Sequence, residues 1–252
     1  MKKVLAVILL LIILGVTCKN PLLSAFLYYQ NQNLKKELIK SSHFLESNFI
    51  KTSSNIEELS IVKCSPNLSI KIPKNLAKNK LSGNENDDLC VVTDLSKKSR
   101  GMIISDSTEI QKAPMEIAMK MLTEMTKVKE TTFLKTTLES LKDMSTIFEQ
   151  NLFLVDLIIH DQSIFSLDEN IFVSTLAKTF SFLNSRSNLA NNYQKLGNFV
   201  FVKEVSTKNN VPTSYLIFTP NNKVYKFEIN EISEDEISAY FNAVAKEGIE
   251  VI

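Results

Sequence analysis

The clearest structural pattern in the chain is "NFVFVKEVSTKNNVPTSYLIFTPNNKVYKFEINEISEDEISAYFNAVAKEG", residues 198–248. It contains three segments rich in β-branched and aromatic residues, at 198–207, 213–219 and 223–230. Short Asn-containing segments separate them, and such segments are typical of tight turns between antiparallel neighbours. The pattern therefore predicts a three-stranded antiparallel meander.

A helix is expected directly after the meander. Ser233 followed by Glu236 forms the capping-box pattern, and Gly248 after Lys246 is a typical helix end. Three apolar residues recur at helical spacing and are expected to face the sheet: Ile237, Phe241 and Val244. The C-terminal third is thus predicted to be a sheet covered by one helix.

Upstream segments also alternate between apolar and polar residues. The stretch 57–76 predicts a strand that ends at Pro73, and "LCVVTDLSKKSRGMIISD", residues 89–106, predicts a hairpin. We therefore expect an antiparallel sheet built from both ends of the chain.

Between these β segments the apolar period changes toward 3.6 residues, from 113 to about 192. Pro114 suits the first turn of a helix whose apolar stripe would contain Ile117, Met121, Met125 and Val128.

Further helices are expected in the same region: 130–150, 168–184 and about 189–196. The apolar segment 151–165 fits a buried strand and a buried helix equally well. The fold class expected is α+β, an antiparallel sheet with packed helices and a helical central region.

Two motifs carry a resemblance to a known group. "SIKIPKN", residues 69–75, and "VYKFEI", residues 224–229, resemble segments of the α/β/α sandwich of the PsbP/Mog1/DcrB-like group. The resemblance covers 60–112 and 198–252 and implies a sandwich fold. The region 113–192 would then be an inserted helical subdomain, or the chain has a different α+β fold. The resemblance carries over no functional residue.

The N-terminus has the form of an export signal. Lys2 and Lys3 precede an uncharged apolar run at 4–17, which is shorter than the roughly 20 residues of a membrane span. Cys18 follows at a polar break and resembles the lipid-attachment cysteine of bacterial lipoproteins, although Gly15 and Thr17 depart from the usual motif. We therefore expect residues 1–18 to be a signal or anchor and Cys18 to carry lipid.

Two alternatives stay open for this segment. In the first, the signal is cleaved without lipidation, which gives a secreted protein. In the second, residues 4–29 remain as an uncleaved anchor that is kinked at Pro21. Lys19 in mid-span disfavours the anchor, because a central lysine costs on the order of 3 kcal/mol. Residues 19–54 are interpreted as a partly helical juxtamembrane stalk, and 55–252 as the globular domain.

The remaining cysteines are expected to form a disulfide. An exported chain meets an oxidising compartment, and lipidation of Cys18 leaves Cys64 and Cys90 as a pair in β-like segments. Two buried free thiols are the alternative.

Signatures of catalysis and metal binding are missing from the sequence. Five glycines form no phosphate-binding loop, and the two histidines, His43 and His160, lie far apart. His160 adjoins Asp161, but adjacent residues diverge on a helix or a strand, so a structural or surface histidine is the favoured interpretation. Asp87 and Asp88 lack the spacing of a calcium loop. No catalytic residue, metal or cofactor is expected.

Charge excludes one class of partner. The formal net charge is +1, and the lysines form only short pairs, so nucleic acid is not an expected partner. We expect an exported accessory or interaction protein of the cell envelope, membrane-anchored with its domain facing the periplasm or the exterior. Its expected contacts are the membrane and a protein partner. The alternative is an exported hydrolase whose site is assembled from scattered residues.

Overall fold

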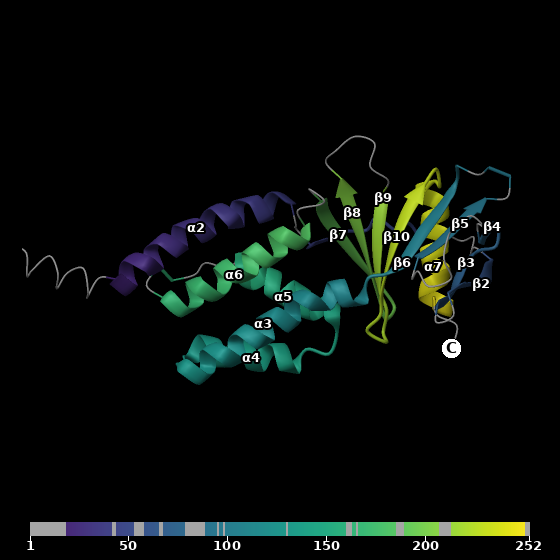
Figure 1. The fold of residues 1–252 in the computed structure, drawn as a ribbon. Coiled ribbons are helices and arrows are strands. Elements are labelled where there is room, and N and C mark those ends of the chain that lie inside the picture. The colour runs from purple at the N-terminus through teal and green to yellow at the C-terminus, as the bar shows by residue number, and fades with distance from the viewer. Residues whose placement is uncertain are drawn as a thin grey trace, which may run out of the picture. The chain divides into compact units, whose positions relative to one another are not determined.

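The computed structural model of the chain (Figure 1) describes residues 19–41, 44–52, 58–65, 68–78, 89–94, 96–97, 99–129, 131–159, 163–164, 166–184, 189–206 and 213–249. The chain divides into two compact units. The helical unit comprises Met1–Lys40, Pro114–Ser145 and Glu149–Arg186, and the β unit comprises Ser41–Ala113, Thr146–Phe148 and Ser187–Ile252. The α+β class is confirmed.

The β unit contains an eight-stranded sheet with the strand order β1-β7-β8-β9-β10-β6-β5-β4. In that order the strands are Phe44–Glu46, Leu189–Leu196, Phe199–Ser206, Thr213–Phe218, Val224–Asn230, Gly101–Asp106, Leu89–Asp94 and Leu76–Lys78. Strand β1 pairs with β7 in parallel, and every other neighbouring pair is antiparallel. A separate hairpin is formed by β2 (Leu59–Ser65) and β3 (Leu68–Pro73).

The predicted meander and its helix are both present. Strand β9 pairs with β8 on one side and β10 on the other. In β10, Phe227 lies opposite Tyr215 of β9 and opposite Ile104 of β6. Helix α7 (Glu234–Glu247) follows, and its capping box is complete: the Ser233 hydroxyl accepts from the Glu236 N–H while the Glu236 carboxylate accepts from the Ser233 N–H.

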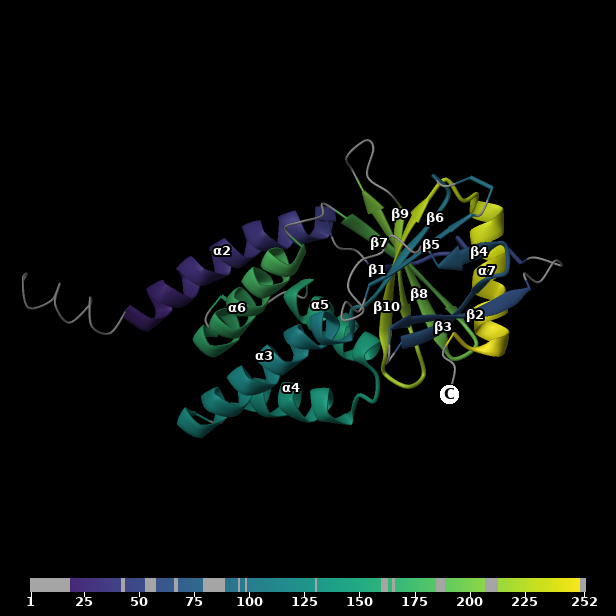
Figure 2. The same cartoon turned by 45° about the vertical axis from the view of Figure 1, so that its right-hand side comes forward.

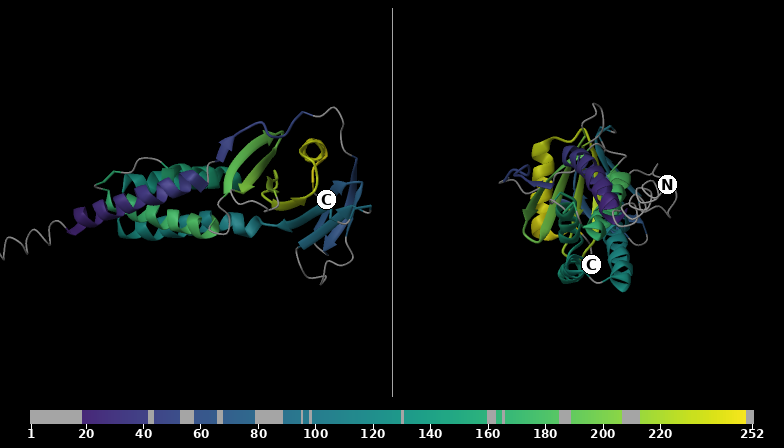
Figure 3. Two further views of the ribbon diagram at one scale, coloured as in Figure 1. Left: turned by 90° about the horizontal axis from the view of Figure 1, so that it is seen from above. Right: turned by 90° about the vertical axis from the view of Figure 1, so that its left-hand side faces the viewer.

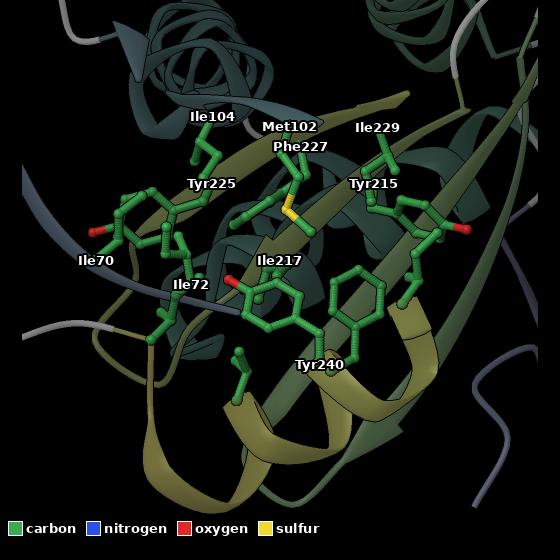
Figure 4. Close-up of a cluster of buried hydrophobic side chains, with 14 of the residues drawn as sticks. Ile70, Ile72, Met102, Ile104, Tyr215, Ile217, Tyr225, Phe227, Ile229 and Tyr240 are labelled. Carbon is green, nitrogen blue, oxygen red and sulfur yellow. The ribbon is translucent and has the colours of Figure 1, made fainter. Parts of the chain in front are cut away.

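The core of the β unit lies between one face of the large sheet and a cover made of α7 and the β2–β3 hairpin (Figures 2 and 4). Tyr240 of α7 is fully buried, and its hydroxyl donates to the Lys71 carbonyl of β3 at 2.9 Å. The Lys71 N–H in turn donates to the Ile249 carbonyl at 3.0 Å. Burial raises the pKa of Tyr240, so its hydroxyl keeps the proton that it donates.

The helical unit contains α2 (Lys19–Ser41), α4 (Thr132–Asp143) and α6 (Leu167–Asn184), together with most of α3 (Thr108–Val128) and α5 (Ile147–Ile159). Its interior is apolar, with fully buried side chains on four helices: Ala118, Leu122, Leu134, Leu154, Phe172 and Leu176. Helix α2, purple in Figures 1 and 3, runs beside α6.

Helix α3 begins earlier than the sequence pattern predicted. It starts at Thr108, directly after β6, and the Asp106 carboxylate accepts the Thr108 N–H at 2.8 Å, one of the N–H groups that a helix leaves open at its start. Pro114 therefore lies inside the helix and not in its first turn. The predicted stripe was wrong at both ends, since Ile117 is 38% exposed and Val128 is 89% exposed, while Met121 and Met125 are half-buried.

Two other helix predictions were wrong. The expected helix at 130–150 is two helices, α4 and α5, and α5 continues to Ile159 through the segment whose state was undecided. The stretch at 189–196 is strand β7, not a helix, because it pairs with β1 on one side and β8 on the other. Pairing on both sides overrides a weak local preference.

Candidate functional site

The helical unit has an open groove between three of its helices. It has a volume of about 550 Å³ and is formed by α4, α5 and α6, with lining residues Thr132, Phe133, Thr136, Thr137, Ser140, Phe153, Leu157, Ser163 and Glu169. Phe133 packs edge-on against Phe172, with ring centroids 6.0 Å apart. The groove therefore has an aromatic wall with hydroxyl groups along one rim.

Helix α4 places these hydroxyls. The Thr131 hydroxyl caps the helix by accepting the Leu134 N–H, and Leu134 and Leu141 turn inward. Thr132, Thr136 and Ser140 then recur every four residues on another face of the helix. This spacing is the sequence signal that would have located the groove, although sequence reasoning missed it.

The described lining of the groove carries little charge. Among the lining residues that the structure describes, Glu169 is the single ionisable one, and Lys129 pairs with the neighbouring Asp168 at 3.0 Å. A lone carboxylate with hydroxyls and aromatic carbons suits the binding of an uncharged or apolar group.

In the β unit, a second cluster surrounds Arg100 at the β5–β6 turn. The guanidinium group lies 3.5 Å from Asp94 and in direct contact with Glu236 of α7. Hydrogen bonds from the Ser96 hydroxyl and N–H, with a smaller contribution from Arg100, hold the pKa of Asp94 below its usual value.

Burial alone would raise the pKa of Glu236, but hydrogen bonds from Ser233 and Arg100 outweigh it and lower that pKa. The cavity beside Arg100 measures only about 10 Å³. The cluster therefore ties the turn to α7 and leaves no room for a substrate.

A third polar group lies on β8, β9 and β10. The Ser214 hydroxyl contacts the Glu204 carboxylate, and Lys226 lies 3.6 Å from the same carboxylate. Ser214 is only 7% exposed, and Ser214 lies between Glu204 and Glu228 in the strand register. These contacts hold neighbouring strands together. The Ser214 hydroxyl is buried in them and is therefore not accessible as a nucleophile.

The predicted disulfide is present in the structure. Cys64 of β2 is bonded to Cys90 of β5, with their Cα atoms 5.0 Å apart and both side chains buried. It joins the β2–β3 hairpin to the large sheet.

Several other predicted positions lie outside the described residues: Cys18, His43, Asp87, Asp88, His160 and Asp161. Across the part of the chain that the structure describes, no three His, Cys, Asp or Glu side chains are grouped to hold a metal ion. None of the described helices combines the length and the hydropathy needed to cross a bilayer.

No family model matches the sequence, and no match to a curated protein or to a solved structure was found. The features of the chain that bear on its function are the groove, the disulfide and the N-terminal sequence.

Proposed function

We propose that the chain is an exported, membrane-tethered accessory protein that acts by binding a partner and not by catalysis. The observation that carries the proposal is the buried Cys64–Cys90 disulfide, because such bonds persist in oxidising compartments and are rare in the cytosol. The two lysines and the apolar run before Cys18 supply the matching export signal. The tether is a lipid on Cys18, and the β unit shares the sandwich of the PsbP/Mog1/DcrB-like group.

The groove on α4, α5 and α6 supports the binding role. Its aromatic and hydroxyl lining with one carboxylate suits an apolar segment of a partner protein. A photo-reactive residue in place of Thr136 in the groove is expected to cross-link the partner in the cell envelope. The same residue in place of Lys178, exposed on α6 and outside the groove lining, is the control. Equal cross-linking from both positions, or none from Thr136, would contradict the groove as the binding surface.

Export and tethering are tested in a bacterial host that lipidates exported proteins. The wild-type chain is expected to incorporate labelled palmitate, to fractionate with membranes and to resist alkylation at Cys64 and Cys90 without reductant. The variant Cys18→Ser is expected to lose the label and to remain unprocessed. Free thiols at both positions would contradict export.

The N-terminus of the wild-type chain separates the two remaining alternatives. An unlabelled chain that still begins at Met1 would indicate that an uncleaved anchor, and not a lipid, tethers the protein to the membrane. An unlabelled chain that begins at Cys18 or Lys19 would contradict the tether and indicate secretion.

A further inference from the structure

Between Leu22 and Asn31, helix α2 buries two polar residues and exposes an apolar face, which is the reverse of the usual arrangement in a water-soluble protein. Ser24 and Asn31 are buried, at 0% and 2% exposed, whereas Leu22, Phe26 and Tyr29 are 66%, 65% and 63% exposed. The three exposed residues follow the i, i+4, i+7 spacing of one helix face. The apolar face therefore points outward.

Hydrogen bonds hold the polar face of α2 inward. The Ser24 hydroxyl donates to the Ile164 carbonyl at 2.7 Å and accepts from the Asn170 side-chain amide at 3.1 Å. The Asn31 amide donates to the Asn170 carbonyl at 3.1 Å. Rotating α2 to bury its apolar face would break these bonds and leave buried polar groups without partners, which is costly.

The exposed apolar side chains are concentrated on this helix. Leu22, Leu23, Phe26 and Tyr29 lie within two turns, while the other exposed large hydrophobic residues of the described chain are spread over several elements. Scattered exposed apolar residues are normal, but a contiguous patch indicates an interaction surface.

The position of the patch in the chain identifies what covers it. Helix α2 begins at Lys19, directly after the uncharged apolar run at 4–17, and Leu22 is four residues from Cys18. At 1.5 Å per helical residue, the patch from Leu22 to Tyr29 spans about 10 Å. Whether acyl chains on Cys18 or the apolar run itself enters the bilayer, the first turns of α2 would lie at its surface.

Charge and residue type fit a lipid surface as well. Helix α2 contains four lysines and one glutamate, and this excess of positive charge is attracted to anionic headgroups. Tyrosine is enriched at the level of the headgroups, because its ring is apolar and its hydroxyl is polar.

We infer that Leu22, Leu23, Phe26 and Tyr29 insert into the interfacial region of the bilayer, so that α2 lies on the membrane surface. This inference rests on the proposed tether. It adds a second membrane contact next to the anchor.

The chain contains no tryptophan, so a single introduced tryptophan reports on its surroundings without background. The full chain from the exporting host is reconstituted with vesicles of phosphatidylcholine and phosphatidylglycerol, and flotation measures attachment. The reporter is Phe26→Trp. The matched control is Ile61→Trp on β2, because Ile61 is 62% exposed.

The emission of Phe26→Trp is expected to shift to shorter wavelength on attachment and to lose most of its intensity with brominated lipids. The emission of Ile61→Trp should not change. A chain that floats while Phe26→Trp keeps its intensity would overturn the inference and leave the tether standing. A blue shift without quenching would indicate that a second copy or a partner protein, and not lipid, covers the patch. That result would also overturn the inference. A chain that does not float would overturn the tether and this inference together.

A second variant tests the patch itself. Tyr29→Trp is expected to be quenched in the otherwise wild-type chain and to lose that quenching when Leu22→Glu and Phe26→Glu are added. Both substituted residues are exposed, so the variant should fold and keep the Cys64–Cys90 disulfide. Unchanged quenching in this variant would contradict the inference.

Discussion

Phe227 shows how single side chains stabilise the β unit. It is fully buried on β10, and its ring lies 6.0 Å from the ring of Tyr240 on α7. Phe227→Asp is expected to lower the free energy of unfolding by more than about 3 kcal/mol, because it removes the ring and buries a carboxylate without a partner. Chemical denaturation measures the loss. Ile61→Asp at an exposed site is the control, and equal stability of the two variants would contradict this position for Phe227.

Asp94 makes the stability of the β unit depend on pH. Hydrogen bonds from Ser96, together with Arg100, lower the pKa of Asp94 in the folded state, so the ionised form stabilises the fold. This contribution is complete above the unfolded-state pKa of about 4 and disappears as the pH falls through the lowered folded-state pKa.

We therefore expect Asp94→Asn to unfold at a lower temperature than the wild type at pH 7. The gap between the two melting temperatures should narrow as the pH falls below about 4. Melting curves across that range measure it. Asp143→Asn, at an exposed site at the end of α4, serves as the control. A gap that stays constant with pH would show that the charge of Asp94 does not stabilise the fold.

Among the secondary-structure elements, helix α7 has a capping box whose contribution to the free energy of unfolding can be measured. The Ser233 hydroxyl accepts from the Glu236 N–H at 3.3 Å and satisfies a backbone donor that the helix leaves open. Ser233→Ala is expected to cost about 1 kcal/mol in the free energy of unfolding. Ser99→Ala, which removes an exposed hydroxyl bonded to Glu231, is the comparison and should cost less. A loss no larger than that of Ser99→Ala would contradict the cap.

Strand β7 shows that an element can depend on distant partners. Its sequence, LANNYQKL, contains two asparagines and weak apolar alternation, so local patterns predicted a helix. Asn191 pairs with Phe44 of β1 and with Glu204 of β8. The strand is thus determined by neighbours on both sides, one of which is far away in sequence.

Across the β unit, the Cys64–Cys90 disulfide holds the β2–β3 hairpin on the eight-stranded sheet. It closes a loop with a sequence separation of 26 residues, for which the loss of unfolded-state entropy corresponds to about 3–4 kcal/mol. The double variant Cys64→Ala, Cys90→Ala is expected to lose about that much stability in chemical denaturation. Adding reductant should destabilise the wild type and leave the double variant unchanged. If reductant also destabilised the double variant, the loss of the disulfide would not be the cause of the destabilisation by reductant.

Local sequence patterns were sufficient to predict the meander, the capped helix α7 and the hairpin at 89–106, and they favoured the pairing of Cys64 with Cys90 over two free thiols. The three elements depend on interactions within a few residues, such as turn chemistry at asparagines and the bond between Ser233 and Glu236, so local patterns contain the information. The disulfide followed from counting the cysteines and from their β-like surroundings.

The remaining features depend on contacts between segments that are far apart in the chain. The groove needs residues from α4, α5 and α6 together, and only the Thr132, Thr136, Ser140 spacing hinted at it. The outward face of α2 depends on Ser24 and Asn31 meeting Asn170, which is at least 139 residues away in the chain. Burial is a property of contacts between distant segments, and the pattern of one helix does not show which of its faces those contacts will cover.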